Sequence, residues 1–311
     1  MRDTAADIAS DPAAALPGPG AGNEHAAATV GPAPGGERAA TPAAPGATSR
    51  AAVAGAPALA PAKTSVVGIP LSLTSYTDVL DYLARRPRDR PTTVAVCNVH
   101  SVMTARRDRA LRAAISDATI ATTDGMPLVW VLRATSRPEQ TRVYGPDLME
   151  LALHTGHEHG LRHFLFGTTP ETLQRLTARI ARDMPHAQVA GSMAPPFRPL
   201  TPEEEDAFVE AVTSSGADIV WVGLGMPRQE LFMHRIAPRL PGVALVGVGA
   251  AFDFLSGTVE QAPAWMQRAG LEWLFRLSRE PKRLWRRYVL NNPLCGVLAL
   301  LQVARHRSAR P

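Results

Sequence analysis

The sequence predicts an α/β protein: a Rossmann-like, mostly parallel sheet with helices on both faces, followed by a C-terminal helical basic appendage. From about residue 63, short apolar runs alternate with stretches of helical periodicity, which is typical of a parallel sheet covered by helices. The apolar runs lack the alternation of half-exposed strands, as expected for strands buried on both faces. Beyond residue 262 only helical patterns remain.

The elements follow in order along the chain. We expect six strands, at residues 92–97, 118–123, 163–167, 187–191, 218–225 and 244–249. We expect helices at residues 76–86, 101–116, 148–160, 170–183, 202–214 and 227–239, and a further apolar helix after Gly125. Thr169 and Thr201 each precede a proline, so a capping hydroxyl stands before the first helical position.

Composition divides the chain into three segments. Residues 1–62 contain 23 Ala, 9 Pro and 8 Gly and no aromatic residue. Such a segment buries too little apolar surface to offset roughly 1–2 kcal/mol of backbone ordering entropy per residue, so we expect a disordered tail. Residues 63–261 suit one α/β domain, and residues 262–311 form the helical appendage.

The net charge of +5 arises from the last segment. Residues 268–311 carry ten basic and two acidic side chains, a charge of +8, while the rest of the chain is slightly acidic. A polybasic terminus on a near-neutral body indicates a local anionic partner: phosphate, a lipid headgroup or nucleic acid.

The appendage combines arginines with apolar side chains. Arg276, Arg279, Arg283 and Arg286 recur at three- and four-residue spacing among Leu, Phe, Trp and Tyr residues, and we expect breaks at Pro281 and Pro293. Such a face can be simply solvated, can lie on an anionic membrane surface, or can clamp a pyrophosphate. The nearby tryptophans and the apolar run 294–304 favour the membrane.

Compartment signals are simple. No stretch reaches the roughly 18 consecutive apolar residues of a membrane-spanning helix, and the N-terminus lacks the basic and apolar regions of a signal peptide. Cys97 and Cys295 are far apart, so no disulfide framework is expected. We therefore expect a reducing, cytoplasmic environment.

Polar residues gather where the predicted strands end, which is where open α/β sheets bind ligands. Asp124 precedes Gly125 and an apolar helix, so it is either a helix cap or a general base. Asn98 has the same two roles open to it, cap or ligand contact. In the segment GLGMPRQE, Gly223 and Gly225 allow close backbone approach and the following helix start offers an anion site, unless it is an ordinary turn.

Two other motifs are weak. The segment GVGAAF around Gly249 lacks the third glycine of a dinucleotide fingerprint, and Asp253 comes too early to be its ribose-binding acid. His154, His157, His159 and His163 have no Cys or paired carboxylate beside them, so we expect a solvated helix end and no metal site.

Taken together, these loops resemble the WecG/TagA/CpsF family of bacterial glycosyltransferases. The matching pieces are the segments beginning CNVHSVMTARR, RVYGPDLM, FLFG, ADIVWVGLGMPRQE, GVGAAFDFLSG and QAPAWMQRAGLEWLFRLSREPKRLWRRY. They cover roughly residues 64–292. The resemblance implies an inverting, metal-independent enzyme without a cofactor, which moves a hexose or N-acetylhexosamine from a UDP-sugar to a polyprenyl-diphosphate-linked sugar. It also implies a cytoplasmic enzyme, peripheral on the inner face of the plasma membrane, in cell-surface polysaccharide synthesis.

The family's motifs carry site roles onto this chain. Asp124 matches the catalytic base, Asn98 flanks the sugar site, Gln229 matches the glutamine of a P-[KR]-Q-E motif, and appendage arginines close over the diphosphate. The full set expected to bind substrate is Asn98, Ser101, Thr123, Gly125, Gly223, Gly225, Arg228, Gln229, Gly249, Asp253, Arg276, Arg283 and Arg286.

Three positions depart from the family pattern, and at one of them Arg228 replaces the commoner Lys. Val96 stands where many members have Thr, so a hydroxyl is missing or supplied by Ser101 or Thr123, and Gln261 stands where many have Arg. The sequence alone also leaves two other function classes open: an NAD-dependent oxidoreductase on a doubly wound sheet, and a nucleic-acid-binding module using the arginine-rich terminus. We expect no nucleic-acid partner, because the apolar run favours lipid. A homo-oligomer is compatible with the sequence.

Overall fold

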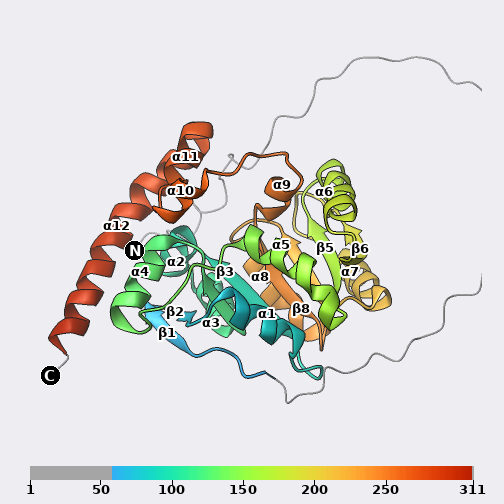
Figure 1. Ribbon diagram of the computed structural model, residues 1–311, viewed down its shortest axis with the longest axis horizontal. Coiled ribbons are helices and arrows are strands. Elements are labelled where there is room, and N and C mark those ends of the chain that lie inside the picture. The colour runs from blue at the N-terminus through green and yellow to red at the C-terminus, as the bar shows by residue number, and fades with distance from the viewer. Residues whose placement is uncertain (1–57, 310–311) are drawn as a thin grey trace, which may run out of the picture. The chain divides into compact units, whose positions relative to one another are not determined.

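The computed structural model describes residues 58–309, and its centre is a six-stranded sheet in which every neighbouring pair is parallel. The strand order is β4-β3-β8-β7-β5-β6 (Figure 1). The strands are β3 (Thr92–Cys97), β4 (Ile120–Thr123), β5 (Arg162–Gly167), β6 (Gln188–Met193), β7 (Ile219–Gly223) and β8 (Ala244–Gly247). The six predicted strands and the α/β fold class are therefore confirmed.

Helices cover both faces of this sheet. The first face carries α1 (Tyr76–Ala84), α5 (Gly145–Thr155), α6 (Pro170–Asp183) and α9 (Ala251–Leu255), whose apolar side chains form one core cluster with the strands. The second face carries α2 (Val99–Ala105), α3 (Arg109–Asp117), α4 (Met126–Thr135), α7 (Pro202–Ser215) and α8 (Arg228–Ile236). Successive strand residues alternate between the clusters: Trp221 points into the first, and Val220 and Val222 into the second.

A β-hairpin precedes the sheet, and the sequence patterns did not predict it. Strands β1 (Lys63–Val66) and β2 (Ile69–Ser72) pair antiparallel around Val67 and Gly68, both with positive φ. The Ala121 backbone N–H donates to Ser72 Oγ at 3.0 Å, which attaches β2 to β4. With four residues in each strand, the hairpin is too short to give a clear period-two pattern.

Two local predictions need correction. The helix expected at 101–116 is two helices, because the Asp108 carboxylate accepts a hydrogen bond from Leu111 N at 3.0 Å and caps a new helix, α3. His163 is not at a solvated helix end. It lies buried in β5, where its Nδ1 accepts a hydrogen bond from Trp221 Nε1 at 3.2 Å, and desolvation lowers its pKa to about 4.

The C-terminal segment is helical, as predicted, with α10 (Ala264–Arg268), α11 (Glu272–Arg279) and α12 (Pro281–Ser308). The expected break at Pro281 is present, but the one at Pro293 is not, since α12 continues through it. Pro293 lies on the exposed side of α12, while Leu284, Tyr288 and Cys295 on the opposite side are buried. Packing of that buried side on α2 and α4 holds the helix continuous.

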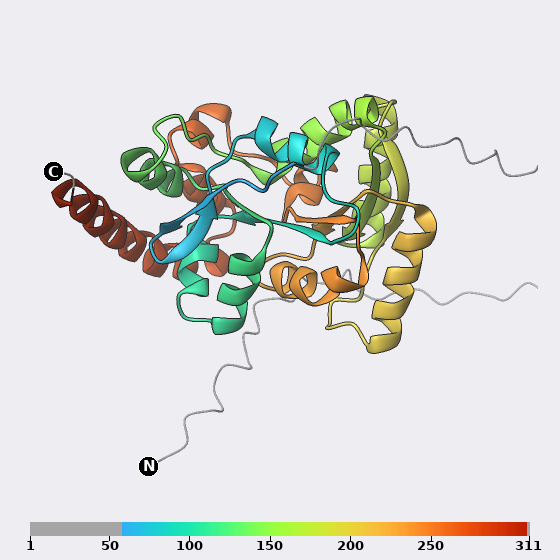
Figure 2. The same ribbon diagram turned by 90° about the horizontal axis from the view of Figure 1, so that it is seen from below.

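The buried side of α12 also reaches the hairpin. Gln302 Oε1 accepts from Val67 N at 2.7 Å, and its Nε2 donates to Ser65 O at 2.6 Å. Figures 1 and 2 show α12 running along α4. Cys295 belongs to the same core cluster as Cys97, and both are free thiols.

No helix within residues 58–309 is long and apolar enough to span a bilayer. We predicted a disordered tail over residues 1–62. Residues 1–57 of this segment fall outside the described part of the chain.

Candidate active site

The site is built where the strands end. The backbone N–H of Asp124, directly after β4, donates to the Cys97 carbonyl at the end of β3 at 2.8 Å, so the loops that follow these two neighbouring strands are joined. Strand β8 lies next to β3, and β7 lies next to β8, so the loops that follow β8 and β7 come next along the sheet. Because all these strands are parallel, their loops share one edge of the sheet, as the sequence predicted.

Asp124 does not cap a helix. The N-cap of α4 is Gly125, and no side chain caps that helix. The Asp124 carboxylate instead accepts hydrogen bonds from Arg142: Oδ1 lies 2.9 Å from Nη2 and 3.2 Å from Nε. Desolvation raises the pKa of Asp124 to about 6, with Arg142 opposing the rise and Glu272 adding to it. A carboxylate with this pKa is ionised near neutral pH and suited to accept a proton.

Arg142 connects this carboxylate to the appendage. Its Nη2 also lies 2.5 Å from Glu272 Oε2 in α11, and its guanidinium stacks over the Tyr144 ring at 4.1 Å. Tyr144 in turn donates its hydroxyl hydrogen to Glu272 Oε1 at 3.3 Å. Sequence reasoning assigned no role to Arg142, Tyr144 or Glu272, although all three lie in segments that carry the resemblance.

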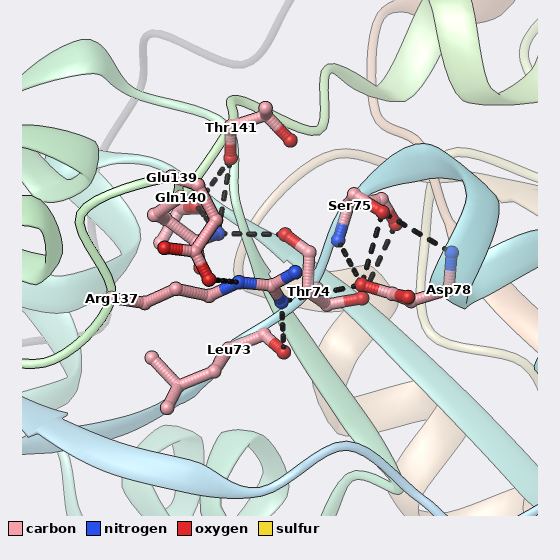
Figure 3. Close-up of polar contacts among 9 residues, drawn as sticks. Leu73, Thr74, Ser75, Asp78, Arg137, Glu139, Gln140 and Thr141 are labelled. Atoms are coloured by element: carbon pink, nitrogen blue, oxygen red, sulfur yellow. Dashed lines mark hydrogen bonds and ion pairs between the residues drawn. The ribbon is translucent and has the colours of Figure 1, made fainter.

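The loop before Arg142 is held by a buried side chain, Gln140, and a half-buried one, Arg137 (Figure 3). Gln140 is fully buried, and its Nε2 donates to the carbonyls of Thr74 at 2.7 Å and Thr141 at 3.0 Å. Arg137 donates to the Leu73 carbonyl at 3.0 Å and pairs with Asp78 at 3.3 Å. These contacts hold residues 137–142 against the start of α1 and so set the position of Arg142.

We expect Gln140→Leu to lower the free energy of unfolding by about 1–3 kcal/mol, because it leaves buried carbonyl groups without a donor. Urea denaturation measures the loss. Glu139→Ala is the matched control, since Glu139 is exposed and its pair with Arg137 contributes little. Equal stability of Gln140→Leu and Glu139→Ala would show that the loop is not anchored by this amide.

Three polar residues expected to bind substrate have structural partners. Asn98 and Ser101 form a capping box at the start of α2, with Asn98 Oδ1 accepting from Ser101 N at 3.1 Å. Thr123 is fully buried, and its hydroxyl accepts from Gln140 Nε2 at 3.2 Å. The hydroxyls of Ser101 and Thr123 thus have partners in the protein's own loops. Asn98 Nδ2, in contrast, has no partner within the described residues.

The glycines allow close packing at this edge. A Cβ on Gly223 would lie 2.9 Å from the Phe252 ring, so any larger residue would push α9 away from β7. Gly225 and Gly249 have φ of +73° and +56°, in the left-handed region that favours glycine. A Cβ on Gly125 would make only ordinary contacts, the nearest 3.5 Å from Val99 N, so Gly125 is not required by packing.

Gln229 and Glu230 form a buried latch between α8 and the β8–α9 turn. Gln229 Oε1 accepts from Gly249 N at 3.0 Å, and its Nε2 donates to Glu230 Oε1 at 3.0 Å. The other carboxylate oxygen of Glu230 is buried and has no hydrogen-bond partner within residues 58–309. Gln229 therefore positions the glycine turn, while Arg228 lies on the surface and contacts the Arg198 carbonyl at 3.2 Å.

Glu230 predicts a pH dependence of stability. Burial raises its pKa from 4.5 to about 7, so the folded state favours the protonated acid. Below the unfolded pKa of 4.5, the contribution of Glu230 to the free energy of unfolding is fully present. That contribution is lost as pH rises toward 7, and the total loss above pH 7 is about 3 kcal/mol. We expect Glu230→Gln to match wild type at pH 4.5 and to melt at a higher temperature at pH 8. If the difference in melting temperature between Glu230→Gln and wild type is the same at pH 4.5 and at pH 8, Glu230 does not have a raised pKa.

Arg276 lies in α11, about one helical turn beyond Glu272. Its charge acts on both Asp124 and Asp253, and its guanidinium lies 5.8 Å from the Phe254 ring. Arg276 makes no ion pair within the described residues, so its charge is available to a ligand. Asp253 accepts weakly from the Thr168 hydroxyl at 3.5 Å.

The other two expected arginines lie at the start of α12. Arg283 pairs with Glu280 at 2.6 Å, and its charge also acts on Asp253. Arg286 is exposed, with its guanidinium 5.7 Å from the Trp285 ring. The structure thus places Arg276 at the site and Arg283 beside it, with Arg286 on the outer surface.

A shallow hollow of about 280 Å³ opens between α1 and α5, lined by Tyr76, Asp147, Glu150, Leu151 and His154. Tyr76 contacts the Asp147 carboxylate at 3.2 Å and accepts from Tyr144 N at 3.0 Å. This hollow lies beside the Arg142 loop, and its lining includes two carboxylates and no arginine or lysine, which does not suit a phosphorylated ligand. Within residues 58–309, no three His, Cys, Asp or Glu side chains are grouped to hold a metal ion.

Comparison with protein families agrees with this arrangement. The model of the WecG/TagA/CpsF family of glycosyl transferases matches residues 64–309, which include the sheet, the Asp124 loop and the whole appendage through α12. The family accounts for the resemblance in the loops and favours a glycosyltransferase over the oxidoreductase alternative. The chain therefore belongs to the WecG/TagA/CpsF family, and it is a glycosyltransferase of cell-surface polysaccharide synthesis.

Proposed function

We propose that this enzyme transfers a hexose or N-acetylhexosamine from a UDP-sugar to a polyprenyl-diphosphate-linked sugar, with inversion and without a metal ion. The observation that carries the proposal is that Asp124 is joined to α11 of the appendage through Arg142, whose Nη2 lies 2.9 Å from Asp124 Oδ1 and 2.5 Å from Glu272 Oε2. Arg276 stands about one helical turn beyond Glu272 in α11, and its charge acts on Asp124. Asp124 can accept a proton from the attacking hydroxyl, and Arg276 can bind a leaving diphosphate. In this proposal both groups act at the same edge of the sheet.

The chemistry needs one base and one anion-binding group. The acceptor hydroxyl loses its proton to Asp124 as its oxygen attacks the anomeric carbon, and UDP leaves from the opposite side. A single displacement needs one carboxylate, unlike the pair used in glycoside hydrolysis. Arg276 and Arg283 stabilise the charge that grows on the diphosphate, and Asn98 Nδ2 donates to the donor sugar.

In this proposal the nucleotide part of the donor binds at the glycine turns. Gly223, Gly225 and Gly249 keep backbone close to the site, and the latch of Gln229 on Gly249 N fixes one of these turns. The buried side chains of Gln229, Ser101 and Thr123 support the loops of the site. The backbones of the glycine turns contact the nucleotide.

The lipid-linked acceptor explains the outer face of α12. Opposite its buried side, the helix exposes seven large apolar side chains: Trp285, Val289, Leu290, Leu294, Val297, Leu300 and Leu301. Lys282, Arg283 and Arg286 stand at one end of this face, Arg305 and Arg307 stand at the other, and residues 281–309 include no acidic residue. An apolar centre with basic ends fits an anionic membrane surface. We therefore place the enzyme on the inner face of the plasma membrane.

A two-step experiment tests the proposed function. UDP-sugars are first screened for thermal stabilisation of the full chain, and the best donor is then incubated with a polyprenyl-diphosphate-linked sugar and analysed by mass spectrometry. We expect a mass gain of one hexose or N-acetylhexosamine on the lipid, retained in the presence of EDTA. A donor that stabilises the protein but is never transferred to such an acceptor, or transfer that EDTA abolishes, would refute the proposal.

A further inference from the structure

One guanidinium is shared by two carboxylates from different parts of the chain. Arg142 Nη2 lies 2.9 Å from Asp124 Oδ1 and 2.5 Å from Glu272 Oε2. Asp124 follows β4 in the sheet, whereas Glu272 begins α11, the helix that leads into α12. All three side chains are largely buried, between 16% and 17% exposed, so water weakens these interactions little.

The partners of Glu272 show that it is held in place. One carboxylate oxygen contacts Arg142, and the other accepts from the Tyr144 hydroxyl at 3.3 Å. Tyr144 also stacks beneath the Arg142 guanidinium. With both oxygens engaged, Glu272 draws the Arg142 charge toward the appendage and away from sole pairing with Asp124.

We propose that Glu272 is a positioning residue of the appendage, which divides the charge of Arg142 between two carboxylates and so keeps Asp124 able to accept a proton. Without Glu272, Arg142 would pair with Asp124 alone and hold it as a weak base. Seating of α11 on the domain and the strength of the base are thereby coupled. This inference rests on the proposed function, in which the acceptor hydroxyl gives its proton to Asp124 while its oxygen bonds to the anomeric carbon and UDP departs with the electron pair.

The charges around Asp124 agree with this division. Arg142 and Arg276 stabilise its ionised form, while Glu272 and desolvation disfavour that form, and their balance leaves its pKa at about 6. Tyr144 lies beside the same group with a pKa raised far above its usual value by burial, so it stays neutral. Removing the Glu272 charge removes one of the two influences that raise the Asp124 pKa.

The test compares Glu272→Gln with wild type and with Glu260→Gln. Glutamine keeps the size and an acceptor oxygen, while the control removes an equal charge from an exposed carboxylate that pairs with Arg279. In wild type we expect kcat/KM for transfer to rise with pH through about 6, as Asp124 ionises. We expect Glu272→Gln to move this acidic limb to lower pH by roughly one unit and to lower the plateau rate, because the base is weaker. Glu260→Gln should leave both unchanged.

A second readout is independent of turnover. In protein labelled with ¹³C at aspartate carboxyls, the Asp124 resonance is identified by its absence in Asp124→Asn, and its titration is followed in each variant. We expect the midpoint of this titration to fall in Glu272→Gln and to stay in Glu260→Gln.

The outcomes separate the two claims. A uniform fall in rate with an unmoved limb and an unmoved Asp124 titration would mean that Glu272 is only structural, and the inference would be overturned. If wild type itself transfers no sugar to a lipid-diphosphate acceptor, the proposed function fails, yet the carboxyl titration still decides whether Glu272 controls Asp124.

Discussion

Replacing Asp124 by Asn is expected to lower the rate of sugar transfer by about 100-fold to 10,000-fold, the usual contribution of a general base. The amide keeps the size of the carboxylate and its hydrogen bond to Arg142, but it cannot take a proton. Arg142 keeps Glu272 as a charged partner at 2.5 Å, so the loop should stay in place. Initial rates with a UDP-sugar and a lipid-diphosphate acceptor measure the effect.

Two controls distinguish loss of the base from loss of the fold. The Kd for UDP, measured by calorimetry, should stay within a few-fold of wild type. The melting temperature at pH 7.5 should be equal or higher, because the raised pKa of Asp124 means that its ionised form is disfavoured in the folded protein. Wild-type transfer by this variant with normal UDP binding would rule out Asp124 as the base.

Placing two acids on the outer face of α12 is expected to release the enzyme from membranes. Val297 and Leu300 are 55% and 72% exposed, and burying each in a lipid interface contributes about 1.5–3 kcal/mol. We therefore expect Val297→Glu/Leu300→Glu to weaken binding to vesicles containing phosphatidylglycerol by roughly 100-fold or more. Vesicle sedimentation measures the partition coefficient.

The matched control is Phe197→Glu, which puts an acid on an equally exposed apolar residue in the segment between β6 and α7. This variant should sediment like wild type. The double variant should also fold normally, since both positions lie opposite the side of α12 that packs on α2 and α4. Undiminished sedimentation of the double variant would mean that the outer face of α12 does not contact lipid.

Much of this site could be predicted because its residues follow buried strands. A run such as residues 92–97 identifies a parallel strand without any partner being known, and its end identifies the edge that binds ligand. Asp124 and Asn98 could be found in this way, as could the glycine turns. The same local logic could not decide between a cap and a ligand contact, and the two differ: Asn98 caps α2, while Asp124 caps nothing.

The remaining residues depend on contacts between distant parts of the chain. Arg142 lies in a loop without periodicity, and Glu272 is 130 positions farther along, so no local pattern relates them. Continuity of α12 through Pro293 likewise depends on packing against α2 and α4, which overrides the local cost of proline. Gln229 matched a motif, but its burial and its bond to Gly249 N appear only in three dimensions.

The central claim is a single displacement in which Asp124 activates the acceptor hydroxyl. The anomeric configuration of the new glycosidic bond tests it most directly, and one-bond carbon–proton couplings of the purified product report it. We expect inversion relative to the UDP-sugar, since one attack from the side opposite the leaving diphosphate inverts the anomeric carbon. Retention of configuration would contradict this mechanism, because a single attack from the side opposite the leaving group cannot retain the configuration of the anomeric carbon.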